Sequence, residues 1–585
     1  MVGDRFLFLL IGMLFLTSCR QHLPDDRGNS VFIRLAAEPG RLHPLLSLTA
    51  PAKQVEMHLF LPLLQFDSKS LELRPALAKS LPEIRSIEEG PFRGGVTYTF
   101  EIHPAAKWDN GQAILATDYV FTIKALLNPN VPAAPYRAYL NFLEDIKIDP
   151  NNPRRFTILT NRPYILAEAA LANIEVYPAY HYDPDSLMNA YTISQLTDST
   201  WLASQADQEL QLKDFALSFA DNSLAKNEQK VVGAGAYRLK EWIPGQSIHL
   251  EKKADWWGNE LVYLESGPAA LHFQIIPDLN AAIGLLKAAQ LDAMSGIPPD
   301  LFLQLKGDAA FARSFQLHSP QKLSYYYVGL NGNTSKLADR RVRRALAHLL
   351  DVDQLIETVL YGLAERVNGP IHPVKPYYNQ ALPAIAFDLE KARALLLESG
   401  WKDTDGDGIL DRQVDGVKTD LSLEFKYSSN NKIAANVGLL LKENARKVGV
   451  EIQPRPVAFN LLVKEYRRRD YEMVYLAWIR PPGLDDLRQS WHSSGNIPGG
   501  SNRTGFGNAA SDQIIDKIRT NFDVQERKEL YISIQEMIYE EQPYIFLYTP
   551  LECMAIHRRF DAMPSVKYPG FFPNEFVQSV LTSPQ

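Results

Sequence analysis

The chain has 585 residues, which at ~150 residues per domain predicts three to four folding units. Hydrophobic residues make up 46% and charged residues 22%, a balance typical of a soluble globular protein, so disordered, collagen-like and coiled-coil chains are excluded. The net charge of −7 argues against nucleic acid as a partner, and two cysteines cannot form a disulfide scaffold.

The first segment predicts export and lipid anchoring. Residues 6–16 form an apolar run that is too short to span a bilayer but has the length of a signal-peptide core. Residues 16–19, Leu-Thr-Ser-Cys, resemble the bacterial lipobox, which implies a signal peptide at 1–18 and a diacylglycerol on Cys19. The alternative is a free cysteine after an ordinary signal. Residues 19–30 are polar with proline and glycine, and predict a lipid-anchored tether.

Strand and helix signals alternate along the body of the chain. Apolar and polar side chains alternate over residues 96–103, which predicts a half-buried strand, and Thr117 suits the N-cap of the next helix. Later, Asp339 is expected to cap a helix that follows a buried strand. A further unit pairs a strand at 421–425 with a helix that ends at Gly449. This alternation predicts an α/β chain of several lobes.

Motifs for catalysis and cofactor binding are missing from the sequence. It contains no nucleophile elbow, zinc-binding helix, Cys-x-x-Cys pair or phosphate-binding loop. The segment that starts Gly233-Ala-Gly235 lacks the third glycine of a dinucleotide fingerprint, so a tight turn before a strand is expected. Cys553 lies in an apolar stretch and is expected to be an inert, buried thiol. The sequence therefore predicts no enzyme and no cofactor.

One acidic segment resembles the start of a calcium-binding loop. Asp403, Asp405, Asp407 and Asp411 stand at loop positions 1, 3, 5 and 9, but position 12, where a glutamate would close the site, is Val414. An acidic turn between a helix and a hairpin is the expected structure, and no metal site is assigned.

Six separated segments resemble the family 5 solute-binding proteins of ABC importers, the dipeptide-, oligopeptide- and nickel-binding type. The most specific one contains Tyr-Thr-Phe, Lys-Trp-Asp-Asn-Gly and Ala-Thr-Asp-Tyr-Val-Phe. All six occur in the family's order along the chain: residues 38–44, 98–121, 231–242, 339–351, 388–401 and 500–506.

The resemblance implies a two-lobed α/β fold of the periplasmic-binding-protein type (type II, large peptide-binding subclass) with an extra early subdomain. Lobe I would comprise residues 31–275 and 550–585, with the inserted subdomain at about 61–230, and lobe II would comprise residues 276–549. Hinge strands would join the lobes, and a solute in the cleft would draw them closed.

The resemblance also implies candidate ligand-binding residues. Trp478 follows the family pattern and would stack on the solute, and Asp485 and Asp486 would meet the amino group of a peptide. Asn502 in the late loop and Glu38 in the first loop are further candidates. The alternatives are a core role for Trp478 and solvated turn roles for the two aspartates. No residue is assigned to catalysis or to a metal.

Taken together, the resemblance implies a lipid-anchored substrate-binding component of an ABC importer on the periplasmic side of the cell envelope. It would bind peptides or a related small solute between its lobes and deliver them to permease and ATPase subunits. It would act as a monomer, with no nucleic acid as a partner. The alternative is a repurposed clamp that serves as an envelope sensor or a chaperone-like partner without transport.

Overall fold

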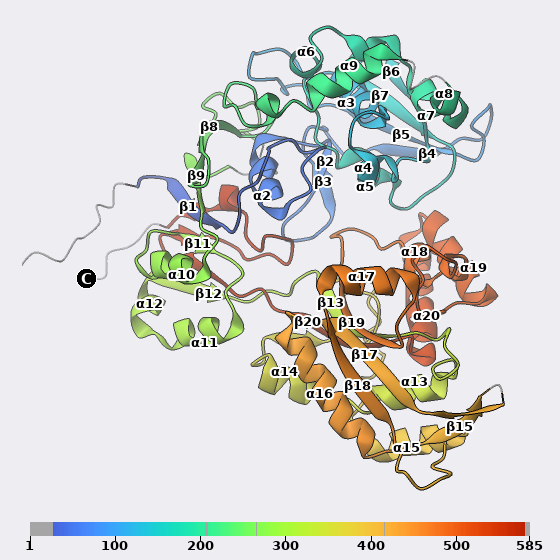
Figure 1. Ribbon diagram of the computed structural model, residues 1–585. Helices are drawn as coiled ribbons and strands as arrows, with labels where there is room; N and C mark the ends of the chain where they lie inside the picture. The colour runs from blue at the N-terminus through green and yellow to red at the C-terminus, as the bar shows by residue number, and fades with distance from the viewer. Residues whose placement is uncertain (1–26, 205–208, 262, 265, 415, 580–585) are drawn as a thin grey trace, which may run out of the picture.

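The computed structural model describes residues 27–204, 209–261, 263–264, 266–414 and 416–579. They form the α/β fold with two lobes that the sequence predicts (Figure 1). Each lobe has a sheet of its own, of seven strands in lobe I and six in lobe II. A smaller subdomain, at the top of Figure 1, extends lobe I above lobe II.

The sheet of lobe I forms around the first strand of the chain. β1 (Ser30–Leu35) has parallel partners on both sides, β10 (Ala270–Ile275) and β11 (Ala293–Met294). Alternate side chains of β1 are buried in the core, as expected for a central strand. The remaining strands are β8 (Tyr237–Ile243), β9 (Ser247–Lys252), β12 (Phe315–His318) and β21 (Met554–His557).

Lobe I extends further along the chain than the sequence predicts. β21 is hydrogen-bonded between β11 and β12, so these two short strands belong to the first sheet. Three helices pack beside them around a separate hydrophobic cluster. Residues 276–318, which the sequence assigned to lobe II, therefore lie in lobe I. The helices are α10 (Leu279–Lys287), α11 (Pro299–Gly307) and α12 (Ala309–Ser314).

The subdomain is a four-stranded antiparallel sheet covered by helices, and its strands all fall within the predicted insertion at about 61–230. The helix expected to be capped by Thr117 begins earlier, at Ala116, because the Asp118 carboxylate accepts the Leu115 N–H at 2.9 Å. Its main elements are β4 (Glu83–Ser86), β5 (Val96–Glu101), β6 (Leu143–Asp149), β7 (Asn152–Thr160), α3 (Ala116–Leu127), α5 (Ala167–Ala172), α7 (Ile193–Thr197), α8 (Ser199–Ser204) and α9 (Leu210–Phe219). Near it lie α2 (Ala50–Leu59), β2 (Leu64–Phe66) and β3 (Leu73–Pro75).

Lobe II has helices on both faces of its sheet. The strand order is β14 (Ala364–Arg366), β20 (Tyr544–Pro550), β13 (Ser324–Leu330), β19 (Met473–Ile479), β17 (Ser422–Ser428) and β18 (Glu451–Val457). One core cluster joins the sheet to α13 (Arg340–Ala347), α14 (Val352–Val359), α15 (Leu389–Glu398) and α16 (Lys432–Arg446). Two others involve α17 (Phe459–Arg468), α18 (Arg488–Trp491), α19 (Ala509–Thr520) and α20 (Val524–Glu541). As predicted, Asp339 caps α13 by accepting the Arg341 N–H.

Two neighbouring segments of chain join the lobes. One leads from β12 to β13 and the other from β20 to β21, and Gln321 and Leu551 form an antiparallel bridge between them. Lys322 N donates to Pro550 O at 2.8 Å, and Glu552 N donates to Pro320 O at 2.7 Å. The connection is therefore a narrow paired ribbon, about which the lobes can rotate.

A buried ion pair fixes the C-terminal segment to lobe I. The Asp292 carboxylate has no exposed surface; it accepts the Phe32 N–H at 2.8 Å and lies 2.6 Å from the Arg559 guanidinium. Arg559 in turn donates to Ser30 O at 2.6 Å. This pair ties β1 to the segment that carries β21 back from lobe II.

We expect Asp292→Ala to destabilise lobe I by about 3–5 kcal/mol, because it leaves the Arg559 charge without its partner in a buried site. The measurement is thermal or denaturant unfolding followed by circular dichroism. Asp214→Ala, at an exposed position in α9, is the control and should change stability by no more than about 0.5 kcal/mol. Equal stability of the two variants would contradict this role for the ion pair.

Candidate functional site

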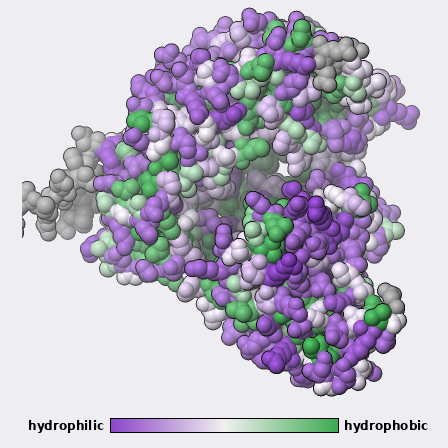
Figure 2. Space-filling model, viewed as in Figure 1, coloured by the Kyte–Doolittle hydropathy of each residue, from purple (hydrophilic) through white to green (hydrophobic). Residues whose placement is uncertain are grey.

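A large cavity lies between the lobes, beside the paired connection. It has a volume of about 1060 Å³. Its walls come from the connection at 321–324, from β19 (Tyr475, Leu476, Ala477 and Ile479), from the first turns of α16 and α17, and from the lobe I loop 565–570. Figure 2 shows the hollow between the upper and lower parts of the molecule. A cavity shared by two lobes and placed at their hinge is the expected position of a ligand site.

Two smaller cavities extend the cleft. One, of about 240 Å³, lies in lobe I and shares Lys567, Tyr568 and Pro569 with the large cavity. The other, of about 210 Å³, lies between the subdomain and residues 481–484 of lobe II. A cavity of about 480 Å³ between α13 and α20 belongs to lobe II alone, and closure of the lobes would not affect it.

Hydrophobic side chains are exposed on the walls of the large cavity. Phe459 of α17 has 58% of its surface exposed, Ile479 at the end of β19 has 85%, and Tyr568 of lobe I has 53%. Figure 2 shows a hydrophobic patch on the rim of the hollow at the position of α17. Apolar residues so exposed at a cleft are typical of a surface that a ligand covers.

The backbone of β19 has a free edge at the cavity. β19 pairs with β13 along its whole length, but its pairing with β17 stops at Val474. From Tyr475 onward, the edge that faces away from β13 has no partner strand among the described residues. An extended chain could add to such an edge through main-chain hydrogen bonds.

The charged groups of the cavity are mainly cationic. Lys322 forms an ion pair with Glu552 at 2.8 Å. Lys432 is exposed at the start of α16 and Lys567 is partly buried, and neither has an ion pair with a carboxylate of the described chain. Burial lowers the pKa of Lys567 to about 8.

Trp478, the predicted stacking residue, does not line the large cavity. Its side chain lies on the opposite face of β19 from Ala477 and packs in the lobe II core, where its indole N–H donates to the Tyr544 hydroxyl at 3.3 Å. Trp478 is only partly buried there, so both the stacking role and the core role of this residue stay predictions.

The two predicted aspartates already have protein partners. Asp485 has no exposed surface; it forms an ion pair with Arg480, with Nε at 2.9 Å, and accepts the Tyr377 hydroxyl at 2.9 Å. Asp486 accepts the Tyr164 hydroxyl at 2.9 Å and Arg519 Nε at 3.0 Å. Both carboxylates therefore have an arginine partner in this structure, and their contact with the amino group of a peptide stays a prediction.

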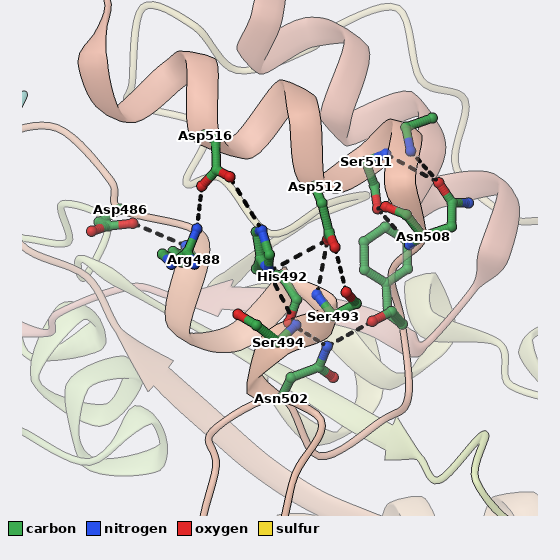
Figure 3. A network of polar contacts seen from close by, with 12 residues as sticks. Asp486, Arg488, His492, Ser493, Ser494, Asn502, Asn508, Ser511, Asp512 and Asp516 are labelled. Carbon is green, nitrogen blue, oxygen red and sulfur yellow. Dashed lines mark hydrogen bonds and ion pairs between the residues drawn. The ribbon is translucent and has the colours of Figure 1, made fainter.

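Asn502 and Glu38 hold loops in place. Asn502 is buried and its amide donates to the carbonyl oxygens of His492 and Phe506, within the network of polar contacts drawn in Figure 3. Glu38 is exposed and accepts the Trp242 indole N–H at 2.7 Å and the Gly245 N–H at 2.8 Å. The structure thus gives both residues structural contacts where the sequence predicts solute contacts.

The lobes also touch on the side of the cleft away from the hinge. Tyr164 of the subdomain reaches Asp486, and its ring lies under the Arg519 guanidinium at 5.1 Å. The next residue, Ile165, donates its N–H to Arg519 O at 2.9 Å and is buried in the lobe II core. Gly483 lies so near the subdomain that a Cβ atom there would be 2.8 Å from the Phe66 ring. We call the contacts of Tyr164 and Ile165 the latch.

The residues that form the cavity were not identified from the sequence. Lys567 and Tyr568 lie outside the six family-like segments, and the only local signal is the turn composition Lys-Tyr-Pro-Gly. Phe459 and Ile479 appear in the sequence as ordinary apolar residues of a helix and a strand. Their exposure at the cleft depends on how the two lobes pack, and this packing cannot be predicted from a local sequence pattern.

The acidic segment forms the expected turn. Carboxylate oxygens of Asp403, Asp405 and Asp411 lie within 4.8 Å of one another, but Lys418 pairs with Asp405 and lies 3.6 Å from Asp411. Asp403 accepts the N–H groups of Gly406 and Gly408. Protein groups therefore balance these carboxylates.

Cys19 and the predicted signal peptide lie outside the described residues. Within the part of the chain that the structure describes, no helix combines the length and the apolar character that crossing a membrane requires. Cys553 is buried, as predicted, and burial raises the pKa of its thiol to about 11.

Comparison with known proteins identifies relatives along most of the chain. The model of the bacterial extracellular solute-binding proteins, family 5 Middle, matches residues 72–498. The oligopeptide-binding protein AppA of Bacillus subtilis is 26% identical over 91% of this chain and 88% of its own length. The structure of AppA with a nonapeptide superposes with a TM-score of 0.64 at 24% identity, covering 94% of this chain and 99% of AppA. NikA of Brucella suis, solved with Fe(III)-EDTA, gives 0.72 at 20% identity, covering 94% and 100%.

We expect Tyr164→Ala to open the unliganded protein, because the variant loses the hydrogen bond to Asp486 and the ring contact with Arg519, together worth about 2 kcal/mol. Small-angle scattering should show a larger radius of gyration. Tyr180→Ala is the matched control, since Tyr180 is a partly exposed tyrosine of the same subdomain whose ring contacts only the neighbouring His181 among the described rings. A scattering curve for Tyr164→Ala that matches the curves of the wild type and the control would contradict the latch.

Proposed function

The chain belongs to the bacterial extracellular solute-binding proteins of family 5, which are binding proteins and not enzymes, and we propose that it binds peptides in the cleft between its lobes as the substrate-binding component of an ABC importer. The observation that carries the proposal is the free edge of β19 at the wall of the large cavity. A peptide in extended form has backbone donors and acceptors that can pair with the unpaired N–H and C=O groups of this edge.

The size and lining of the cavity support a peptide as the solute. Its volume of about 1060 Å³ is at the upper end of the ~300–1,000 Å³ that is usual for a small-molecule site. Backbone hydrogen bonds along β19 would be common to all peptides, while Phe459, Ile479 and Tyr568 would contact side chains. The complex of AppA with a nonapeptide supports the same solute class in a relative.

Delivery would follow from closure about the paired ribbon. A solute that contacts both walls of the cavity binds the closed form more tightly than the open form. It therefore stabilises the closed form by the difference between the two binding free energies. The permease and ATPase subunits of the importer would then recognise the closed, loaded monomer. The lipid on Cys19, after removal of residues 1–18, would hold the protein at the periplasmic side of the envelope, with residues 19–30 as a tether.

We expect a peptide that binds to raise the melting temperature and to make the particle more compact. At a free concentration of 100 times Kd, the stabilisation is about 2.7 kcal/mol. The measurement is differential scanning fluorimetry on a panel of peptides of about two to eight residues, with small-angle scattering on those that shift the transition.

The panel is repeated with two variants that remove an exposed hydrophobic side chain. Phe459→Ala should weaken binding by about 1–2 kcal/mol, because Phe459 lines the cavity. Leu439→Ala, at an exposed position of α16 outside the cavity, should leave the affinity unchanged. A complete absence of shifts would reject the peptide and leave a non-peptide solute or the repurposed clamp.

A separate prediction concerns the anchor. Cys19→Ser should release the protein into the soluble fraction or leave it unprocessed, because the thiol is the site of the lipid. The test is membrane fractionation of cells followed by mass spectrometry of the mature chain. A variant that stays in the membrane fraction as a mature-sized, acylated protein would show that Cys19 is not the anchor.

A further inference from the structure

The large cavity carries more positive than negative charge. Lys322, Lys432, Arg480 and Lys567 line it, against Glu552 as the only carboxylate among the described lining residues. Glu552 balances Lys322, and the buried Asp485 balances Arg480. Lys432, on lobe II, is exposed to solvent, and Lys567, on lobe I, is partly buried; neither has an ion pair in the described chain.

Lys567 is held in a fixed position at the junction of two cavities. Its Nζ donates to Phe66 O at 2.7 Å and lies 4.9 Å from the centre of the Phe572 ring. The loop around it is closed by the hydrogen bonds Ser565 N to Gly570 O, at 2.7 Å, and Lys567 N to Ser565 Oγ, at 3.0 Å. The position of the ammonium group is therefore set before any ligand arrives.

The acidic groups around Lys567 are shared with a second cation. Glu575 and Asp67 favour the charged form of Lys567, but Arg74 lies 3.1 Å from Asp67 and 3.8 Å from Glu575. An ammonium group has three donors, and the structure describes one hydrogen bond for that of Lys567. A partly buried cation whose N–H donors have no acceptors raises the free energy of the folded protein. An anion that accepts those hydrogen bonds removes this penalty.

We propose that Lys567 is a specificity-determining residue that binds an anionic group of the solute, a carboxylate, in the part of the cleft that lobe I supplies. The inference rests on the proposed peptide-binding function and specifies which peptides are preferred. The ammonium group faces the lobe I cavity of about 240 Å³, which Phe66, Arg74 and Phe572 also line. With Asp485 and Asp486 already paired, the charge that the cleft selects is negative.

A peptide offers this carboxylate either at its C-terminus or on an acidic side chain, and three probes separate the two. They are pentaalanine with a free carboxyl end, pentaalanine amide, and the amide of Ala-Ala-Glu-Ala-Ala. Isothermal titration calorimetry of the wild type should show that at least one acid-bearing probe binds about 10- to 100-fold more tightly than pentaalanine amide. The probe that does so identifies the source of the carboxylate.

Lys567→Met should reduce the ratio of the affinities for the acid-bearing probe and for pentaalanine amide toward one, and Lys567→Arg should retain that ratio. Lys69→Met, at an exposed position outside the cavity, is the control and should behave as the wild type. Equal binding of the three probes to the wild type would overturn the inference without the need for a variant, as would a preference that survives in Lys567→Met. A third outcome is that no probe binds to the wild type and that no peptide of the panel raises its melting temperature. In that case the proposed peptide-binding function is wrong, and the inference about Lys567 is wrong with it.

Discussion

The chain passes between its lobes at two places, and the two crossings are hydrogen-bonded to each other. This pairing, between Lys322 and Pro550 and between Glu552 and Pro320, constrains the rest of the molecule. Because both crossings lie side by side, the lobes can rotate about the paired ribbon, and such a rotation changes the shape of the cavity next to it. The same pairing places Lys322 and Glu552 in the cavity wall, so the hinge and the site share residues.

The strands next to the second crossing belong to the central sheets of the two lobes. β20 lies inside the sheet of lobe II, and β21, which follows it directly, lies inside that of lobe I. The C-terminal segment is fixed there by the buried pair of Asp292 and Arg559 and then supplies the loop that carries Lys567. Part of the cleft is thus built from the end of the chain, far in sequence from β19 and α17, which form the opposite wall.

The sequence predicted the family, the two-lobed α/β fold and local features with a strong signal, such as β5 and the Asp339 cap. It misplaced the start of lobe II because β11 and β12 have two and four residues, too few for a periodic pattern. It expected an amine-binding role for Asp485 because the sequence does not show that the Arg480 side chain turns back onto that carboxylate. The role of Lys567 depends on tertiary packing, which no sequence motif encodes.

Structures with a similar fold hold solutes as different as a nonapeptide and Fe(III)-EDTA, so the residues of the cleft, rather than the fold, determine what is bound.

Binding of a peptide in the cleft would give the hinge, the latch and the cavity a common function. The most direct test is native mass spectrometry of the protein purified gently from its own cells, with sequencing of whatever small molecules are released on denaturation. The account predicts that the released molecules are peptides and that their masses account for the difference between the native and the denatured protein. A retained molecule that is not a peptide, with a mass that accounts for that difference, would contradict it.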